Sequence, residues 1–162
     1  MAIEKARAAA KKDKREGKSA STQAGEYVHE VIENIRKGKH GARSTKQAIA
    51  IGLSEARRDG IKLPVSKTAS KTVKKKAAQD TKAGKHPHKP SATRSKAITK
   101  ALKKEGHIAA SIKALSAQTK KASAKRTAAS RSAAAKKAVK TKGAAGRSAA
   151  AKKAARTRKK AD

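Results

Sequence analysis

The chain has 162 residues, 45 Lys and Arg against 11 Asp and Glu, a formal net charge of +34 at pH 7 and no cysteine, which excludes disulfides and Cys-ligated zinc. Leu, Ile and Val together number 18, and there is no Phe or Trp. Bulky apolar residues are therefore about 11% of the chain, below the roughly 20% under which a highly charged chain is expected to be disordered. We expect a mostly disordered or marginally helical protein, all-α where it is ordered.

The charge is divided unevenly along the chain. Residues 1–64 hold 15 basic and 8 acidic side chains, residues 65–162 hold 30 basic and 3 acidic ones, and no acid lies between Glu105 and Asp162. Such an imbalance attracts polyanions, of which nucleic acid is the commonest inside cells. The N-terminus lacks the apolar run of a secretory signal, and no stretch has the length of a membrane span. We therefore expect a soluble cytoplasmic protein at the nucleoid.

Residues 1–22, rich in Ala and Lys, are expected to form a flexible basic arm. The pattern changes within residues 23–65, which are the candidate domain. From about Gln23 to Lys37, branched residues recur at i, i+3, i+4 and i+7, the spacing of one stripe of an α-helix, and two nearby glycines end the pattern. The stripe consists of Val28, Val31, Ile32 and Ile35.

A second helix is predicted to begin at Ser44. The run Ser44-Thr45-Lys46-Gln47 fits a capping box, in which the Ser hydroxyl and the Gln side chain satisfy free backbone N–H groups. Gly52 would allow a neighbouring helix to approach closely. Asp59-Gly60 is expected to end the helix and Pro64 to prevent a restart. The apolar stripe consists of Ile49, Leu53 and Ala56.

After this helix, Ile61, Leu63 and Val65 follow at period two, which predicts a short extended flap over a small αα-hairpin. About forty residues are near the lower size limit for independent folding, so we expect the hairpin to need DNA or self-association through residues 23–65. Tyr27 is expected in its core rather than as a residue that stacks on bases.

The rest of the chain is predicted to lack a core of its own. Residues 66–93 are expected to be a flexible linker, and residues 94–115 a weak helical segment that folds only on contact with a partner. Residues 116–162 form a low-complexity tail. Alanine and lysine favour helix there, but repulsion between lysines at i, i+4 opposes it.

The octapeptide RSAAAKKA occurs twice in the tail, at residues 131–138 and 147–154. A continuous helix would turn by about 160° between the two copies, so they would face apart. Gly143 and Gly146 interrupt the helix first. Each copy is therefore expected to be a short docking segment of its own.

Residues 38–64, GKHGARSTKQAIAIGLSEARRDGIKLP, resemble a block in a family of short basic bacterial proteins of unknown function, and this resemblance implies no activity. The tail, with AAAKKAVKTKGAAGRSAAAKKAARTRKKA, is similar in composition to the Ala/Lys-rich tails of linker histones and of bacterial histone-H1-like proteins. That second resemblance implies polyanion chemistry of the same kind, although SPKK-type turns are missing.

The function that these observations predict is sequence-nonspecific binding and compaction of double-stranded DNA. Lys and Arg neutralise phosphates and release condensed counterions, and a merely solubilising tail would not need to be nearly free of acids. The phosphate contacts expected in the tail are Lys120, Lys121, Lys125, Arg126, Arg131, Lys136, Lys137, Lys140, Lys142, Arg147, Lys152, Lys153, Arg156, Arg158, Lys159 and Lys160. Secondary phosphate contacts are expected from Arg43, Lys46, Arg57 and Arg58.

The alternative is an RNA- or ribosome-associated basic protein, although a single aromatic residue argues against modules that stack on single-stranded bases. Membrane binding is disfavoured because the tail has few bulky apolar anchors. The hairpin could also be a helix-turn-helix, but the sequence indicates no third helix.

No enzymatic activity, cofactor or metal is predicted. The chain has no phosphate loop of the GxxxxGK[ST] form and no Cys nucleophile. Glu55 and Asp59, spaced i, i+4, are expected on a solvated face. The segment His86-Pro87-His88 has no further ligand close by in the sequence.

Overall fold

The computed structural model describes residues 2–66, 68–86 and 91–159. Along these residues the chain forms seven α-helices and one short 3₁₀ helix, and no strand occurs among them. The chain divides into two compact units, Met1–Gln118 and Thr119–Asp162. The expectation of a mostly disordered or marginally helical chain is therefore wrong, because helices cover most of the described residues.

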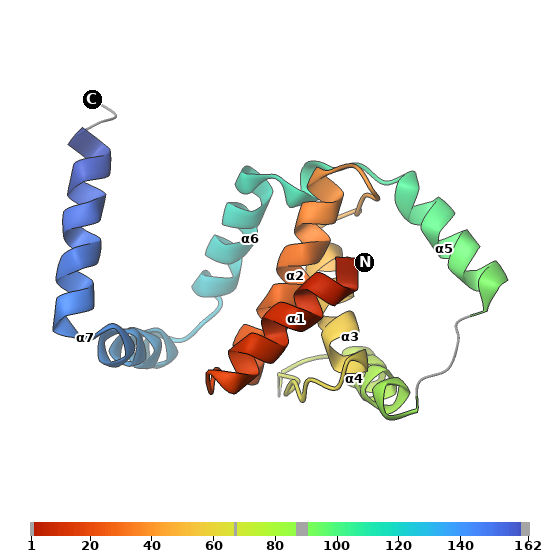
Figure 1. The fold of residues 1–162 in the computed structure, drawn as a ribbon, viewed down its shortest axis with the longest axis horizontal. Coiled ribbons are helices and arrows are strands. Elements are labelled where there is room, and N and C mark those ends of the chain that lie inside the picture. The colour runs from red at the N-terminus through yellow and green to blue at the C-terminus, as the bar shows by residue number, and fades with distance from the viewer. Residues whose placement is uncertain (1, 67, 87–90, 160–162) are drawn as a thin grey trace. The chain divides into compact units, whose positions relative to one another are not determined.

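The first unit is built around α2 (Ala20–Arg36). Helices α1 (Ala2–Arg15) and α3 (Thr45–Arg58) both pack against α2, and α4 (Lys71–Lys85) packs against α3 (Figure 1). The hairpin of α2 and α3 is thus covered by two helices of the same chain. One of them, α1, is a third helix beside the hairpin that the sequence did not indicate.

The first unit is completed by α5 (Ala92–Lys103), η1 (Ile108–Ala110) and the start of α6 (Ile112–Ala124). Two backbone hydrogen bonds connect the loop after α2 to the end of α5: the Gly41 N–H donates to Leu102 O at 2.9 Å, and the Ala42 N–H to Gly106 O at 3.1 Å. The segment expected to be weakly helical is therefore helical and joined by hydrogen bonds to the hairpin.

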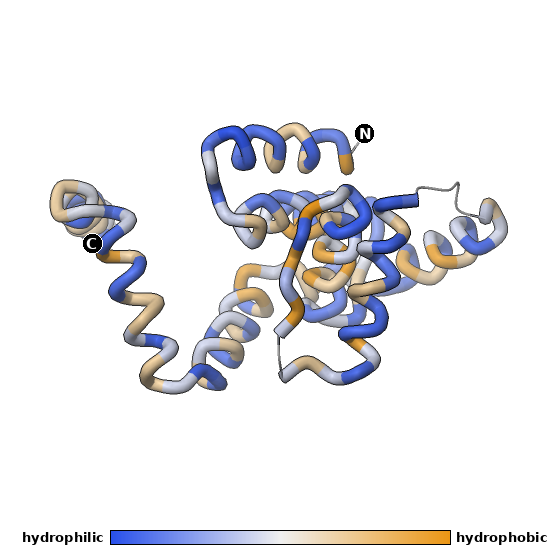
Figure 2. The backbone as a smooth tube through the Cα atoms, turned by 90° about the horizontal axis from the view of Figure 1, so that it is seen from below, coloured by the Kyte–Doolittle hydropathy of each residue, from blue (hydrophilic) through white to orange (hydrophobic). Residues whose placement is uncertain are grey.

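Two clusters of buried residues form the core, and most of their members are small. Nine of the thirteen buried apolar residues among those described are alanines. Figure 2 shows apolar stretches of the chain lying inside the first unit. The first cluster consists of Val31, Ile32, Ile35, Ala42, Ala48, Ala109 and Ala110. The second cluster consists of Ala6, Ala10, Ala24, Tyr27 and Ala56.

The count of bulky residues was misleading because this core is built by close approach of helix backbones. A Cβ atom placed on Gly52 of α3 would lie 2.6 Å from Val28 Cα and 2.8 Å from Val28 N of α2. At such a distance alanines suffice to fill the space between helices. Because the core needs few large side chains, a chain with 18 Leu, Ile and Val residues can fold a unit of this size.

Local signals for the individual helices are strong. The side chains of Ser19, Ser44 and Ser70 each accept a hydrogen bond from the backbone N–H three residues on, at the N-termini of α2, α3 and α4. Such caps stabilise a helix by about 1 kcal/mol each. The cap at Ser70 explains why the segment expected to be a linker contains α4, whereas α1, in the segment expected to be an arm, packs against α2.

The hairpin follows the predicted pattern closely. Val31, Ile32 and Ile35 are buried, and Tyr27, predicted as a core residue, is 1% exposed. Ile61 and Leu63 pack against the second cluster, as their period-two spacing predicts.

The cap and the buried face of α3 differ from the prediction in detail. The Ser44 Oγ accepts the Gln47 N–H at 3.2 Å, but the Gln47 side chain accepts from Arg43 N at 2.9 Å, one residue earlier than in a capping box. Ile49 and Leu53 are only partly buried. The buried positions of α3 are instead Thr45, Ala48, Gly52 and Ala56.

The tail is helical as well. After the end of α6, α7 runs over Ala128–Lys159 and is interrupted at Gly143, whose backbone is non-helical at φ 63° and ψ 176°. The sequence predicted interruptions at Gly143 and Gly146, but Gly146 lies within the helix, and the sequence did not predict that helix would extend on both sides of Gly143.

We expect Gly52→Ala to lower the free energy of unfolding by about 1–3 kcal/mol, because its Cβ would clash with the backbone of Val28. Gly25→Ala is the matched control. Gly25 also lies inside a helix, α2, but its Cβ would meet nothing within 4 Å, so we expect a gain of up to about 1 kcal/mol. Thermal unfolding followed by circular dichroism measures both. Equal behaviour of the two variants would contradict the close approach of α2 and α3.

Candidate nucleic-acid interface

The basic residues predicted to contact phosphates lie on an exposed surface of the second unit and of the end of α6. Every side chain from Thr119 to Arg158 is exposed. Lys120 and Lys121 lie on α6, Lys125 and Arg126 lie in the turn that follows, and the others up to Lys159 lie on α7. Lys160 lies outside the described residues. The structure thus brings most of the predicted contacts onto helices rather than onto a disordered tail.

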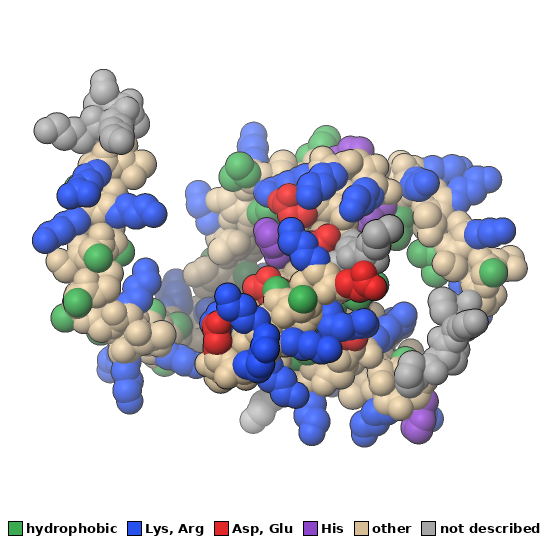
Figure 3. Space-filling model, viewed as in Figure 1, with side chains coloured by type: hydrophobic (Ala, Val, Ile, Leu, Met, Phe, Trp, Pro, Cys, Tyr) green, Lys and Arg blue, Asp and Glu red, His purple; other side chains and the backbone are tan. Residues whose placement is uncertain are grey.

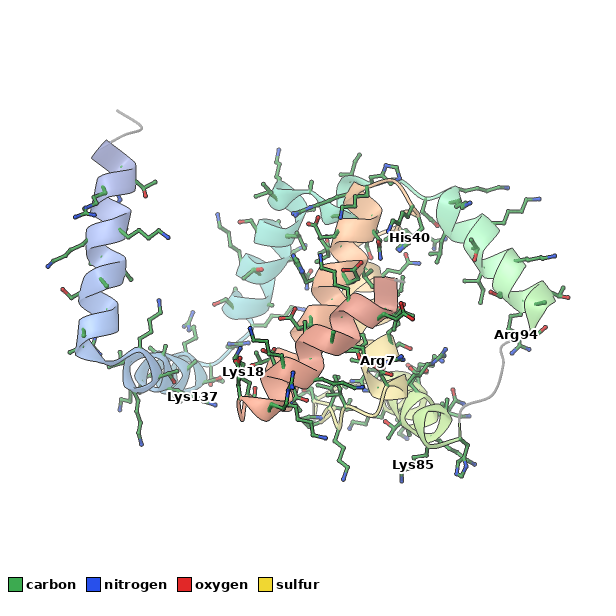
Figure 4. All side chains as sticks on the ribbon, viewed as in Figure 1. Arg7, Lys18, His40, Lys85, Arg94 and Lys137 are labelled. Carbon is green, nitrogen blue, oxygen red and sulfur yellow. The ribbon has the colours of Figure 1, made fainter. Side chains whose placement is uncertain are left out.

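Among the described residues, no acid forms an ion pair with these cations. Residues 106–161 contain no Asp or Glu, and none of the ion pairs between described residues involves α7. The visible face of α7 in Figure 3 shows Lys and Arg without acidic side chains. Figure 4 labels one of these lysines, Lys137, on the first half of α7. Lys136 and Lys140 share one side of that half with it, because residues three and four apart lie close together on a helix.

The four secondary contacts predicted in the hairpin differ from one another. Arg43 keeps 83% of its side chain exposed, with its Nε 3.7 Å from a Glu105 carboxylate oxygen, and Lys46 is exposed. Arg57 is partly buried, and its Nε is buried with no hydrogen-bond partner among the described residues. Arg58 is paired with an acid of α4. Arg43, Lys46 and Arg58 are therefore exposed, although Arg58 also pairs with an acid, and Arg57 is the one of the four that is partly buried.

The acid that pairs with Arg58 is Asp80, which is 2% exposed. Asp80 accepts hydrogen bonds from Ser54 Oγ at 2.8 Å, Arg58 Nε at 3.0 Å and Lys76 Nζ at 3.1 Å. Burial by itself would raise the pKa of Asp80, but the hydrogen bonds from Ser54, Lys76 and Arg58 outweigh it and lower the pKa. This carboxylate fastens α4 to α3. The sequence offered one signal for it, a single acid within a segment rich in lysine.

A second acid, Asp59, joins three helices at the end of α3. Arg7 Nε donates to both Asp59 carboxylate oxygens at 2.8 Å, and the Tyr27 hydroxyl also donates to Asp59. The hydrogen bond from Arg7, ahead of the opposing effect of burial, lowers the pKa of Asp59, whereas burial and Asp59 raise the pKa of Tyr27. The expectation that Asp59 lies on a solvated face is wrong, because its side chain is 18% exposed and bound by Arg7. The sequence could not indicate this contact, since Arg7 lies 52 residues away.

Next to Asp59 lies an open cleft of about 690 Å³. Its basic residues come from α1 and from the segment after α3, and Figure 4 labels one of them, Arg7. Sequence reasoning did not predict a basic surface here, because it treated residues 1–22 as a flexible arm. The basic residues lining the cleft are Arg7, Lys11, Lys14 and Lys62.

Neither a metal site nor a membrane span is found in the described part of the chain. No group of three or more His, Cys, Asp or Glu residues described by the structure could hold a metal ion, and of the histidine pair around Pro87, His88 lies outside the described residues. No helix in the described ranges is long and apolar enough to cross a bilayer.

Comparison with known proteins concerns only the hairpin. Residues 15–67 match the model of a family of unknown function, DUF6496. The match covers α2, α3 and the flap, and it includes the block at residues 38–64 whose resemblance was noted from the sequence. No curated protein and no solved structure matches the chain. The likeness of the tail to histone tails therefore rests on composition alone.

The first prediction from these contacts concerns Asp80. Asp80→Asn removes the anion that Arg58 and Lys76 share, so we expect a loss of about 1–3 kcal/mol in unfolding free energy and faster hydrogen exchange in α4. Glu105→Gln is the control, because its pair with Arg43 is exposed and long, and should change stability by less than about 0.5 kcal/mol. Urea unfolding and amide exchange measure both effects. Unchanged exchange in α4 would mean that residues 66–93 act as a linker after all.

The second prediction concerns pH and Glu55. Burial, together with repulsion from Glu30 and against attraction from Arg58, raises the pKa of Glu55 from 4.5 to about 7. The folded state thus binds the proton more tightly, and the resulting stability is present below pH 4.5 and lost as the pH rises to about 7. We expect Glu55→Gln to stabilise the protein by about 1–3 kcal/mol above pH 7 and to change little below pH 4.5.

Glu16→Gln serves as a control of opposite sign for Glu55. The hydrogen bond from Lys18 lowers the pKa of Glu16, so the ionised carboxylate contributes stability above its ordinary pKa, and its removal should lower stability at neutral pH. Denaturant unfolding at a series of pH values measures both variants. A Glu55→Gln variant that gains the same stability at every pH would show that the effect is not ionisation.

Proposed function

We propose that this protein binds double-stranded DNA without sequence specificity and compacts it at the nucleoid, in a binding rather than an enzymatic role. One observation carries the proposal: the described side chains of the second unit are all exposed, and residues 106–161 contain many cations but no Asp or Glu. A helix that buries none of its side chains and carries one sign of charge gains neither packing contacts nor charge neutralisation from its own chain. An external polyanion would neutralise its charge.

The shape of α7 suits duplex DNA. An α-helix with its side chains is about 10–12 Å across, close to the width of the major groove at about 12 Å. Alanines between the basic residues add little bulk, so the helix backbone can come near the phosphates. Each phosphate neutralised by Lys or Arg releases condensed counterions, and this gain is independent of base sequence.

The composition favours contact with the backbone over reading of bases. Tyr27 is the chain's one aromatic residue and is buried, so it cannot stack on bases. The basic residues of α7 are spread around the helix and between alanines, as suits phosphates along a groove. The similar composition of linker-histone tails is in line with this proposal.

The first unit would add further phosphate contacts, and these would help to position the protein on the duplex. Arg43 and Lys46 are displayed at the start of α3. The cleft beside Asp59 carries several cations of α1, a surface that a disordered arm would not provide. Contacts of this kind position a protein on DNA without specifying sequence.

Fluorescence anisotropy with unrelated labelled duplexes tests the proposed function. We expect similar affinities for all sequences and a loss of about 10³-fold or more between low and physiological salt. A chain that ends at Gln118, the boundary of the first unit, should lose most of the affinity, because the acid-free unit is removed.

Three outcomes would contradict this proposal. A preference of tenfold or more for one duplex sequence would indicate base readout. Full affinity in the chain that ends at Gln118 would place binding in the first unit. An affinity for RNA of the same length that exceeds the affinity for DNA by tenfold or more would identify the protein as RNA-associated instead.

A further inference from the structure

The repeated octapeptide is part of a longer repeat of charge. Sixteen residues after each basic residue of the segment 131–142 stands another basic residue, and Ser132 and Thr141 recur as Ser148 and Thr157. The agreement extends beyond the eight identical letters and includes positions where Lys is replaced by Arg. The basic pairs are Arg131 and Arg147, Lys136 and Lys152, Lys137 and Lys153, Lys140 and Arg156, and Lys142 and Arg158.

The two copies also have the same local structure. Thr141 Oγ1 donates to Lys137 O at 2.9 Å, and at the equivalent place Thr157 Oγ1 donates to Lys153 O at 3.0 Å. The basic residues of both copies are exposed. One copy differs: Arg147 Nη1 donates to Val139 O at 3.3 Å, which satisfies a carbonyl near the end of the first half.

The break at Gly143 lies between the two sets of cations. Its φ of 63° is in the left-handed region that favours glycine, so the helix stops and starts again at this residue. Lys136, Lys137 and Lys140 precede the break, and their counterparts follow it. In an unbroken helix the two sets would point about 160° apart, so no single helix face could present both.

We propose that the two halves of α7 are equivalent duplex-binding segments, and that one molecule holds two separate stretches of double-stranded DNA, one on each half. The inference rests on the proposed function and deepens it, because it gives compaction a mechanism: bridging by a single chain. Each half has its own complete set of basic residues on a helix of its own. A chain with two sites can hold two duplexes at once, so bridging needs no dimer of the protein.

The test uses the full-length chain and two duplexes. One duplex is fixed to beads, a second carries a dye, and the protein is added at low ionic strength. Protein retained on the beads measures binding, and recovered dye measures bridging. Each variant is compared at a concentration that gives the same amount of bound protein, so that a change in affinity does not appear as a change in bridging.

Three variants distinguish the halves. The first replaces Lys136, Lys137 and Lys140 by Gln, and the second replaces Lys152, Lys153 and Arg156 by Gln. The third, the matched control, removes the same number of exposed charges from α5 by Lys96→Gln, Lys100→Gln and Lys103→Gln. Gln has a helix propensity close to that of Lys and Arg, so circular dichroism should show α7 retained in all of them.

We expect each of the first two variants to lower dye recovery by about tenfold at equal bound protein, because a chain with one intact site cannot hold a second duplex, and the two reductions to agree within about a factor of two. The control should bridge as the unaltered chain does. Each α7 variant should keep nearly the same slope of log K against log salt for binding one duplex, because the intact half retains its full set of phosphate contacts.

Results of three kinds would overturn the inference while leaving the proposed function intact. Bridging that survives loss of either half would place the second site in the first unit or in a dimer of the protein. Loss in one α7 variant alone would show that the halves are not equivalent. Equal loss in the α5 control would show that total charge decides. If the unaltered chain is not retained on the beads at all, the proposed function itself fails.

Discussion

The contact between Gly52 of α3 and the backbone of Val28 of α2 is the constraint on which the first unit depends. Because no side chain separates the two helices there, alanines fill the rest of the interface and few bulky residues are needed. The same crossing places Tyr27 beside Asp59, where Arg7 of α1 joins them. The core and the polar contacts around it thus follow from one close approach.

Acidic residues decide which part of this strongly basic chain can pack. Ten of the eleven Asp and Glu residues lie within the first unit, and two of them join elements there: Asp59 joins α1 to α2 and α3, and Asp80 joins α4 to α3. Each such acid offsets the repulsion between cations brought together by folding. The second unit has no acid before Asp162, so its cations stay apart on an extended helical surface.

The sequence predicted those features of the fold that depend on local patterns of residues. It indicated the buried stripe of α2, the cap at Ser44, the burial of Tyr27 and the extended flap, because periodicity and capping act over a few residues. It did not predict that the segments expected to be an arm, a linker and a tail are helical, because a count of bulky residues ignores close packing by alanine. It also misplaced Asp59 and missed the ion pair of the exposed Arg58, because their partners, Arg7 and Asp80, are distant in sequence.

Alanine has opposite consequences in the two units. In the first unit it fills narrow gaps between helices and is buried, as at Ala24 and Ala48. In α7 it sits exposed between basic residues, where it favours helix without supplying an apolar face that could pack on anything. A helix of this kind cannot be recruited into the chain's own core. In the function that we propose, its charges contact an external polyanion, and the repeat with a break at Gly143 gives the chain two such surfaces rather than one.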